Sequence, residues 1–258
     1  DWMWANKAVF DANGISVPTS WDELNAAAEK LQAAGIIPFA HGGQAWQDAT
    51  VFEAVAMGIG GNNYYKNCYV DLKETCLRSE TTVKVFDQMR KLQGFTDEGS
   101  PGRDWNVATG MVIEGKAGFQ IMGDWAKGEF TAAGKVPGVD YYCAATPSNN
   151  GYLYNVDSFI FYKTSDPDKQ EGQKLLAKLM MGKNFQKVFN LYKGSIPARL
   201  DVPMDEFDKC AKTSNSDIKT AGASGGLVPS FAHGMAQGNT MKAALQDVIT
   251  EHFNSDMS

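Results

Sequence analysis

The chain has 258 residues, of which 43% are hydrophobic and 21% are charged, a composition typical of a folded globular protein and not of a disordered one. Its length allows one large or two small domains. The net charge is −6 and no cluster of Lys or Arg forms a basic stripe, which argues against nucleic acid or an anionic membrane as a partner. No apolar run approaches the roughly 20 residues that a membrane span needs.

Helix and strand signals alternate along the chain, which predicts an α/β fold. Ser20 and Glu23 form a capping box, so we expect a helix from there to Gly35. A short buried strand follows at 36–39. The next helices run through 51–58 and, with Ser79 as N-cap, through 83–92. Apolar residues at helical spacing mark the expected core-facing sides: Leu24, Ala28 and Leu31; Val51, Phe52, Val55 and Ala56; Val83, Phe86, Met89 and Leu92.

The second half of the chain continues the alternation. Residues 117–122 read as a strand between two glycines, and 158–162 read as another. Asp166 or Pro167 opens a helix with apolar residues at 175, 176, 179 and 180, and a further helix ends near Gly194. The stretch 213–226 is rich in Ser, Thr, Gly and Asn, which predicts a surface loop. The last helix is expected at 240–253.

Four cysteines leave two interpretations open. Cys68, Cys76, Cys143 and Cys210 are an even number, with no Cys-x-x-Cys motif and no His at metal-ligand spacing. They indicate either two disulfides in an oxidising compartment or four buried thiols in a cytosolic protein. A metal site is not expected in either case.

Two tryptophans, each next to a carboxylate, are the most informative pair in the sequence. Trp105 follows Asp104, and Trp125 follows Asp124, directly after the strand expected at 117–122. A pyranose stacks its C–H faces on aromatic rings while its hydroxyls need carboxylates and amides. Ligands of open α/β sheets also collect at strand ends. The pattern therefore predicts a sugar site, although each indole could instead pack under a helix.

Further candidate ligand contacts lie elsewhere in the chain. Asn155 and Asp157 alternate with Tyr154, Val156 and Ser158, so on an extended segment both face the same way, and together they offer a donor and acceptors to sugar hydroxyls. His41 and Gln44 flank two glycines that permit close approach, and Trp46 and Gln47 follow them. His233 lies between the expected loop and the last helix. A hinge turn or a packed histidine is the competing interpretation for these residues.

An enzymatic function is not expected. Asp124 and Asp157 could be the two carboxylates of a glycoside hydrolase, but a sugar-binding cleft needs acidic acceptors as well. The sequence lacks the Gly-x-Ser-x-Gly, P-loop and His-Glu-x-x-His motifs. A glycoside hydrolase and a sugar-sensing regulatory domain remain the two alternatives to a binding protein.

Several ordered motifs together resemble one family. They are 40–50 (AHGGQAWQDAT), the 105–125 segment, 154–158 (YNVDS) and 194–199 (GSIPAR). In them the chain is similar to the bacterial glucose/mannose-binding proteins of ABC importers, which belong to the solute-binding class of maltose-binding protein. The resemblance implies a periplasmic protein without cofactor or metal, monomeric when complete, that delivers a monosaccharide to a membrane permease. Glucose is the first choice, with mannose or galactose next. It also implies ligand contacts for Trp105, Trp125, Asn155, Asp157, His233, Asp124, His41 and Gln44.

The same resemblance implies a two-lobed, type II-like periplasmic-binding-protein fold. Residues 1–155 would form the C-terminal lobe, 156–199 a return segment of the N-terminal lobe, and 200–258 the last helices of the C-terminal lobe. Such proteins carry a long stretch before the segment that Trp2 and Trp4 resemble, so we expect this chain to be part of a longer protein whose N-terminal part is missing. In a periplasmic protein, we expect disulfides Cys68–Cys76 and Cys143–Cys210.

Overall fold

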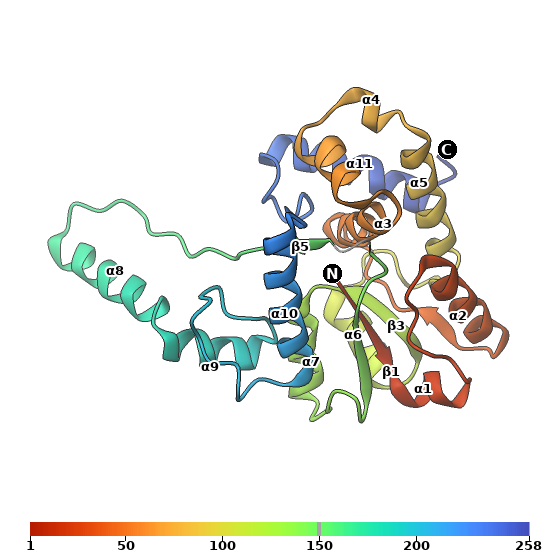
Figure 1. Ribbon diagram of the computed structural model, residues 1–258, viewed down its shortest axis with the longest axis horizontal. Helices are drawn as coiled ribbons and strands as arrows, with labels where there is room; N and C mark the ends of the chain where they lie inside the picture. Colours follow the sequence, from red (N-terminus) through yellow and green to blue (C-terminus); the bar gives the residue numbers. More distant parts are fainter. Residues whose placement is uncertain (149–150, 258) are drawn as a thin grey trace.

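A computed structural model describes residues 1–148 and 151–257 of the chain (Figure 1). Its centre is a four-stranded sheet in the order β2, β3, β1, β4, in which β2 and β3 are parallel and β1 is antiparallel to both of its neighbours. The expected α/β fold is confirmed. The strands are β1 (Trp2–Asn6), β2 (Ile37–Phe39), β3 (Ala117–Met122) and β4 (Tyr141–Ala145).

Alternating side chains of β1 divide the core into two layers. Met3 and Ala5 point into the larger layer, and Trp2 and Trp4 point into the smaller one. Both indoles are almost fully buried. The larger layer is covered by α2 (Trp21–Ala33), α3 (Ala45–Tyr65), α5 (Glu80–Gln93) and α11 (Asn239–Asn254), and the smaller one by α6 (Trp105–Ile113), the short η2 (Asp124–Ala126) and α7 (Lys127–Ala132).

Local capping explains where two of these helices begin. The Ser20 hydroxyl accepts a 3.2 Å hydrogen bond from the Glu23 amide at the start of α2, and Ser79 caps α5 in the same way. Both starts are as predicted. The expected buried side of α5 is wrong at Val83, which is 59% exposed, whereas Val85 is buried. Val85, Met89 and Leu92 follow i, i+4, i+7 spacing and form the true core side.

The stretch 213–226 is not the surface loop that its composition predicts. Most of it belongs to α10 (Lys209–Ser224), whose N-cap Asp208 accepts a 2.9 Å hydrogen bond from the Ala211 amide. The buried residues Cys210, Ala211, Ser214 and Ala221 lie on one side of this helix. Packing of small side chains therefore overrides their weak helix propensity.

The segment 156–199 extends away from the rest of the molecule (Figure 1). The strand predicted at 158–162 is wrong: this stretch pairs with no other strand among the described residues. A strand needs a neighbour for its backbone groups, and none lies beside it here. α8 (Pro167–Met180) begins at Pro167, one of the two predicted starts, with Asp166 as its N-cap, but it has no buried residue.

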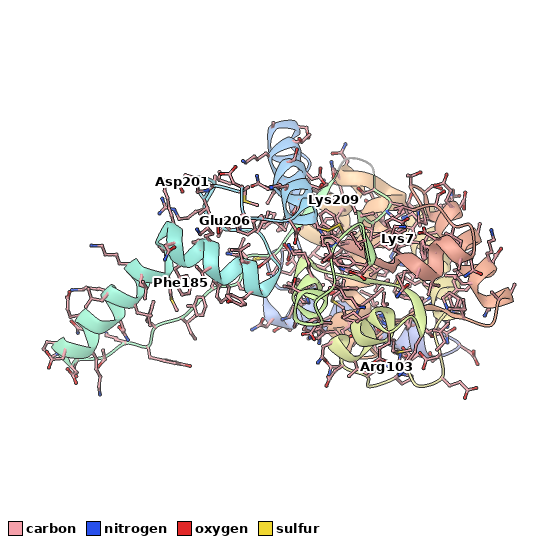
Figure 2. All side chains as sticks on the ribbon, turned by 90° about the horizontal axis from the view of Figure 1, so that it is seen from below. Lys7, Arg103, Phe185, Asp201, Glu206 and Lys209 are labelled. Atoms are coloured by element: carbon pink, nitrogen blue, oxygen red, sulfur yellow. A yellow bond between two sulfur atoms is a disulfide. The ribbon has the colours of Figure 1, made fainter. Side chains whose placement is uncertain are left out.

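α9 (Lys183–Lys193) leads this segment back to the body. Phe185 at its start lies on the projecting part (Figure 2). Its end contacts α7 closely: Gly194 has a φ of 95°, and a Cβ there would approach the Gly128 amide nitrogen to 2.6 Å. Only glycine fits both the positive φ and this close backbone contact.

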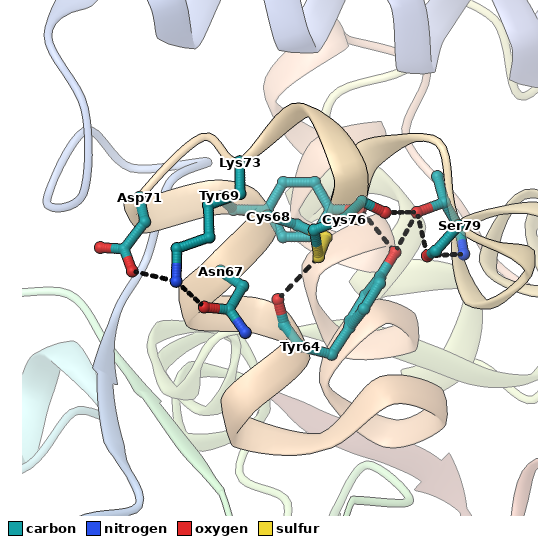
Figure 3. The surroundings of a disulfide bond; sticks show 9 residues. Tyr64, Asn67, Cys68, Tyr69, Asp71, Lys73, Cys76 and Ser79 are labelled. Carbon is teal, nitrogen blue, oxygen red and sulfur yellow. Dashed lines mark hydrogen bonds and ion pairs between the residues drawn. A yellow bond between two sulfur atoms is a disulfide. The ribbon is translucent and has the colours of Figure 1, made fainter.

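Two disulfides fasten outlying elements, and both predicted pairings are confirmed. Cys68–Cys76 closes the turn between η1 (Lys66–Val70) and α4 (Glu74–Leu77) (Figure 3). Beside it, the Tyr64 hydroxyl forms hydrogen bonds with the hydroxyls of Tyr69 and Thr82. Cys143–Cys210 joins β4 to α10. The remaining elements are α1 (Lys7–Ala12) and the parallel pair β5 (Tyr152–Tyr154) and β6 (Leu227–Pro229). Within the described residues, no helix has the length and apolarity to cross a membrane.

Candidate functional site

The candidate residues follow the carboxyl ends of two pairs of parallel strands. β2 and β3 are parallel neighbours, so the chain after β2, with Gln44 and Trp46, and the chain after β3, with Asp124 and Trp125, leave the same edge of the sheet. β5 and β6 are also parallel. Asn155 and Asp157 follow β5, and His233 follows β6. The topology therefore gathers residues that lie far apart in the sequence.

An aromatic cluster of Trp46, Trp125 and His233 forms the centre of the site. The Trp125 and His233 rings are edge to face with centroids 5.2 Å apart, and Trp46 lies 6.1 Å from His233 and 6.5 Å from Trp125. All three side chains are partly exposed. They present partly accessible ring surface, which suits the C–H face of a sugar.

Gln44 links this cluster to the start of α6. Its side-chain oxygen accepts a 2.7 Å hydrogen bond from the Trp46 indole, and its amide nitrogen donates at 2.6 Å to Asp104, the N-cap of α6. Trp105 follows and packs, partly exposed, in the same apolar layer as Trp46 and Trp125. The two indoles singled out in the sequence thus pack against the same layer, and Trp46 packs there with them.

Asp124 combines partial exposure with a poorly solvated carboxyl. Burial raises the pKa of this carboxyl above its usual value, while Lys193 and a hydrogen bond from the Ile196 amide lower it in part. Because a carboxylate in such a place is incompletely hydrated, further hydrogen-bond donors would stabilise it. Hydroxyl groups of a ligand are donors of this kind.

Asn155 and Asp157 point toward each other, as their alternation predicts. The Asn155 amide donates to Asp157 at 3.1 Å, and Lys193 forms an ion pair with the same carboxylate. Burial tends to raise the pKa of Asp157, but the ion pair with Lys193 and the hydrogen bond from Asn155 lower it overall. Asp157 therefore remains an ionised acceptor at neutral pH. Lys193 stands between the two acidic candidates and was not among the predicted site residues.

A buried carboxylate, that of Glu53, positions the His233 ring through the Ser230 hydroxyl. Its Nδ1 lies 2.9 Å from the Ser230 hydroxyl, and that hydroxyl contacts both carboxyl oxygens of Glu53, at 2.7 and 2.9 Å. Glu53 is 1% exposed on α3. Neither Glu53 nor Ser230 could be recognised in the sequence, because their importance depends on a contact across 177 residues.

His41 is placed differently from the other candidates. It is 1% exposed, its Nε2 lies 2.7 Å from Asp48, and its ring packs between Phe39 and Phe253. A side chain so enclosed presents no atom to a ligand in this conformation. Its direct sugar contact is thus not supported by the geometry: the glycines beside His41 serve packing, since a Cβ on Gly42 would collide with Gln47.

A cavity of about 490 Å³ lies between β5 and α10, and none of the eight predicted site residues lines it. Tyr152, Thr146 and Asp217 are among its walls. Burial raises the pKa of Tyr152 far above its usual value, and the charge of Asp124 adds to the effect, so the tyrosine stays a neutral hydrogen-bonding group. The cavity therefore combines an aromatic ring with hydroxyl and carboxyl groups in its wall.

Residues 1–180 match the family model of the bacterial extracellular solute-binding protein. The chain belongs to this family. It is 48% identical over its whole length to a probable sugar-binding periplasmic protein of Brucella suis biovar 1, and 45% identical to a protein of the same name from Rhizobium meliloti. It spans 61% and 62% of the lengths of these relatives.

The fold agrees with this membership. A solved chitin oligosaccharide binding protein superposes with a TM-score of 0.79 at 19% identity, covering 97% of this chain and 64% of that protein. The α/β solute-binding-protein fold, present in part, is therefore established. The family consists of binding proteins and not enzymes, and it is extracellular, which confirms the predicted location outside the cytoplasmic membrane. An oxidising location also accounts for the two disulfides.

Proposed function

We propose that the protein containing this chain captures a sugar in the periplasm and delivers it to the permease of an ABC importer. The single observation that carries the proposal is the surface at the strand ends, where Trp46, Trp125 and His233 stand beside two acidic acceptors. The names of the relatives from Brucella and Rhizobium support the same ligand class.

The site supplies both kinds of contact that a pyranose needs. Trp125 and Trp46 offer ring faces, with Trp105 at the border of the surface. Asp124 and Asp157 accept from hydroxyls in charge-assisted hydrogen bonds, each worth about 1.5 to 3 kcal/mol. Lys193 donates to sugar oxygens from between them. Binding needs no covalent step.

We propose a monosaccharide as ligand, with glucose first and mannose or galactose next. The aromatic cluster is small, because the centroids of its three rings lie within 6.5 Å of one another. A cluster of this size offers stacking surface to one sugar ring. The name of the similar solved structure specifies an oligosaccharide, so longer sugars are the alternative that an experiment has to separate.

We further propose that 1–155 and 200–258 form one lobe and that 156–199 belongs to the opposite one. In support, residues of α11 and the stretch after β6 share a core with α2, α3 and α5, whereas α8 buries none of its residues. A sugar bound at the strand ends would then lie where the lobes meet. Closure about residues 154–158 would bury it, and the closed form would dock on the permease.

Isothermal titration calorimetry of the full-length gene product against a panel of aldoses and their short oligomers tests the proposal. We expect glucose to bind with a dissociation constant in the micromolar range or tighter, and its disaccharides to bind more weakly. Tighter binding of the oligomers would overturn the monosaccharide assignment. No binding of any sugar would overturn the proposed function, and release of nitrophenol from aryl glycosides would indicate a hydrolase.

A further inference from the structure

The proton on the His233 ring is placed by the groups beneath it. A serine hydroxyl has one hydrogen to donate. The Ser230 hydroxyl uses it on Glu53, whose two oxygens lie 2.7 and 2.9 Å away. The oxygen of Ser230 can then only accept, and it accepts a 3.1 Å hydrogen bond from the His233 backbone amide. The ring Nδ1 of His233, 2.9 Å from the same oxygen, must be the second donor.

Glu53 is kept in the accepting role by its other neighbours. Two acceptors lie beside the Tyr65 hydroxyl, Oε2 of Glu53 at 3.0 Å and the Pro229 carbonyl at 3.2 Å, and the charged, nearer Oε2 takes its hydrogen. The Ala232 amide donates to the same Oε2 at 3.3 Å. Burial, together with the charge of Glu53, raises the pKa of Tyr65 well above its usual value, so the phenol keeps its hydrogen. Every group around this carboxylate thus donates to it, and the hydrogen of Ser230 is drawn in the same direction.

The other ring nitrogen of His233 is buried and has no hydrogen-bond partner in the structure. A buried polar atom without a hydrogen-bond partner costs about 1 to 3 kcal/mol of free energy. A ligand that supplies the missing partner to this nitrogen removes that cost. This nitrogen belongs to a ring that stands edge to face against Trp125 and near Trp46. Those are the two rings on which we place the sugar.

We infer that His233 is a specificity-determining residue that offers its unprotonated Nε2 as an acceptor to one sugar hydroxyl, with Glu53 and Ser230 as positioning residues that hold the proton on Nδ1. The inference rests on the proposed sugar-binding function. It fixes the direction of one hydrogen bond: the sugar hydroxyl that faces Nε2 of His233 must be the donor. A sugar carbon without a hydroxyl hydrogen there is rejected, because the nitrogen would stay buried and unpaired.

Nitrogen-15 NMR of the full-length protein tests the tautomer without any substitution. The neutral imidazole gives distinct shifts for its protonated and bare nitrogens, and the signals of His233 are identified by their loss in His233→Gln. At alkaline pH we expect Nδ1 to carry the hydrogen, and addition of glucose to shift the Nε2 signal while Nδ1 stays protonated. A hydrogen on Nε2 would overturn the inference, since it would mean that Glu53 is protonated and the relay runs the other way.

One substitution is expected to invert the relay. In Glu53→Gln the amide oxygen replaces Oε2 to keep Tyr65 and Ala232 satisfied, which leaves the NH₂ group facing Ser230 as a donor. Ser230 then donates to Nδ1, and the hydrogen of His233 moves to Nε2. Glucose affinity should fall about tenfold or more with the fold retained. Asp48→Asn is the matched control: it also converts a buried carboxylate, but one that contacts His41 and Thr250, and glucose affinity should be unchanged.

Deoxy and deoxyfluoro glucoses identify the hydroxyl concerned. Fluorine accepts weakly and cannot donate, so at the position facing His233 both analogues should lose about tenfold or more relative to glucose, and this loss should shrink in Glu53→Gln. Position-specific losses that are identical in wild type and Glu53→Gln would overturn the inference while leaving sugar binding intact. If no sugar binds wild type, the proposed function fails with it, whereas the NMR measurement still decides the tautomer.

Discussion

The body of the molecule (1–155 with 200–258) and the arm (156–199) both contain helices with apolar residues at helical spacing. These residues are buried in the body and exposed in the arm. In the body, α5 turns Val85, Met89 and Leu92 into a core that excludes water. In the arm, α8 projects from the body (Figure 1) and carries Leu175, Leu176 and Leu179 at the same kind of spacing, and these leucines remain exposed. Amphipathic periodicity therefore states which side of a helix will be covered, but not what covers it.

The difference between body and arm also locates the site. Asp124, Trp125 and His233 belong to the body, whereas Asp157 and Lys193 belong to the arm. The candidate site lies along the line where the two regions meet. Groups on both sides of a closure can contact a ligand at once, which is how a moderate number of hydrogen bonds gives tight binding.

The largest difference in unfolding free energy should appear when a core residue and an arm residue are each replaced by alanine. Trp4→Ala removes an indole that is 1% exposed and should cost about 3 to 5 kcal/mol of unfolding free energy. Leu175→Ala removes a side chain that is 60% exposed and should change the free energy by less than about 0.5 kcal/mol in residues 1–258 alone. Urea denaturation followed by circular dichroism measures both.

The same pair of variants in the full-length gene product sharpens the comparison. If the arm packs against another lobe there, Leu175→Ala should cost about 2 to 5 kcal/mol, as for a core leucine. Residues 1–258 alone should expose apolar surface to a dye such as ANS and should associate as their concentration rises above that used for denaturation. A monomeric 1–258 product that melts cooperatively and binds glucose tightly would contradict the assignment of 156–199 to a second lobe.

The two disulfides should differ in the stability that they add. Cys143–Cys210 spans 67 residues and Cys68–Cys76 spans 8, so the chain-entropy relation gives about 4 kcal/mol for the first and about 2.5 kcal/mol for the second. Paired Cys→Ser substitutions, compared by urea denaturation, measure the difference. Peptide mapping without reducing agent is the accompanying check, and four alkylatable thiols in the native protein would refute both bridges.

Sugar affinity should respond to the indoles of the body and to the acid of the arm. Trp125→Ala and Trp105→Ala should each weaken glucose binding by about 1 to 3 kcal/mol, the range for a buried aromatic contact. Asp157→Asn should also weaken it, because an amide presents a donor where a hydroxyl needs an acceptor. Val107→Ala on the same helix as Trp105 is the control, since Val107 is exposed. Wild-type affinity in all three variants would remove these residues from the site.

Most helices could be predicted because their signals are local. The cap and first turn of α2 and α8 lie within four residues, so the sequence alone locates both starts. The miss at α10 has a different origin. Its Ser, Thr and Gly residues favour a loop by composition, and only the burial of Cys210, Ala211 and Ala221 against neighbouring parts of the body makes them helical. The unpaired stretch 158–162 shows the converse, a strand pattern with no neighbouring strand.

The site could be predicted where its chemistry was visible in adjacent residues. The Asp–Trp pairs at 104–105 and 124–125 are of this kind, and both indoles pack against the same apolar layer. Lys193 and Glu53 could not be found, since a lysine at a helix end and a glutamate within an apolar helix have no local signature. Their roles depend on contacts with Asp157 and Ser230 that only the tertiary fold creates.

The smallest expected effect concerns two carboxylates of the body that respond to pH in opposite directions. The ion pair with Arg103 lowers the pKa of Asp97, so its contribution to stability is complete above the usual Asp value of about 3.9 and is lost as the pH falls through the folded-state pKa. Burial raises the pKa of Asp124, where arm and body meet. There the folded state binds the proton more tightly than the unfolded chain, so stability declines as the pH rises through the folded-state pKa.

Replacing each acid by its amide separates the two contributions. Asp97→Asn should destabilise the protein at neutral pH and flatten the acid side of its stability curve. Asp124→Asn should do the reverse, raising the free energy of unfolding at neutral pH slightly while weakening glucose binding, because the buried charge that costs stability is the one that accepts from the sugar. Urea denaturation between about pH 3 and about pH 8, with calorimetry on the same samples, measures both quantities. If Asp124→Asn lost stability and kept its affinity, the carboxylate would be a structural anchor between arm and body and not a ligand contact.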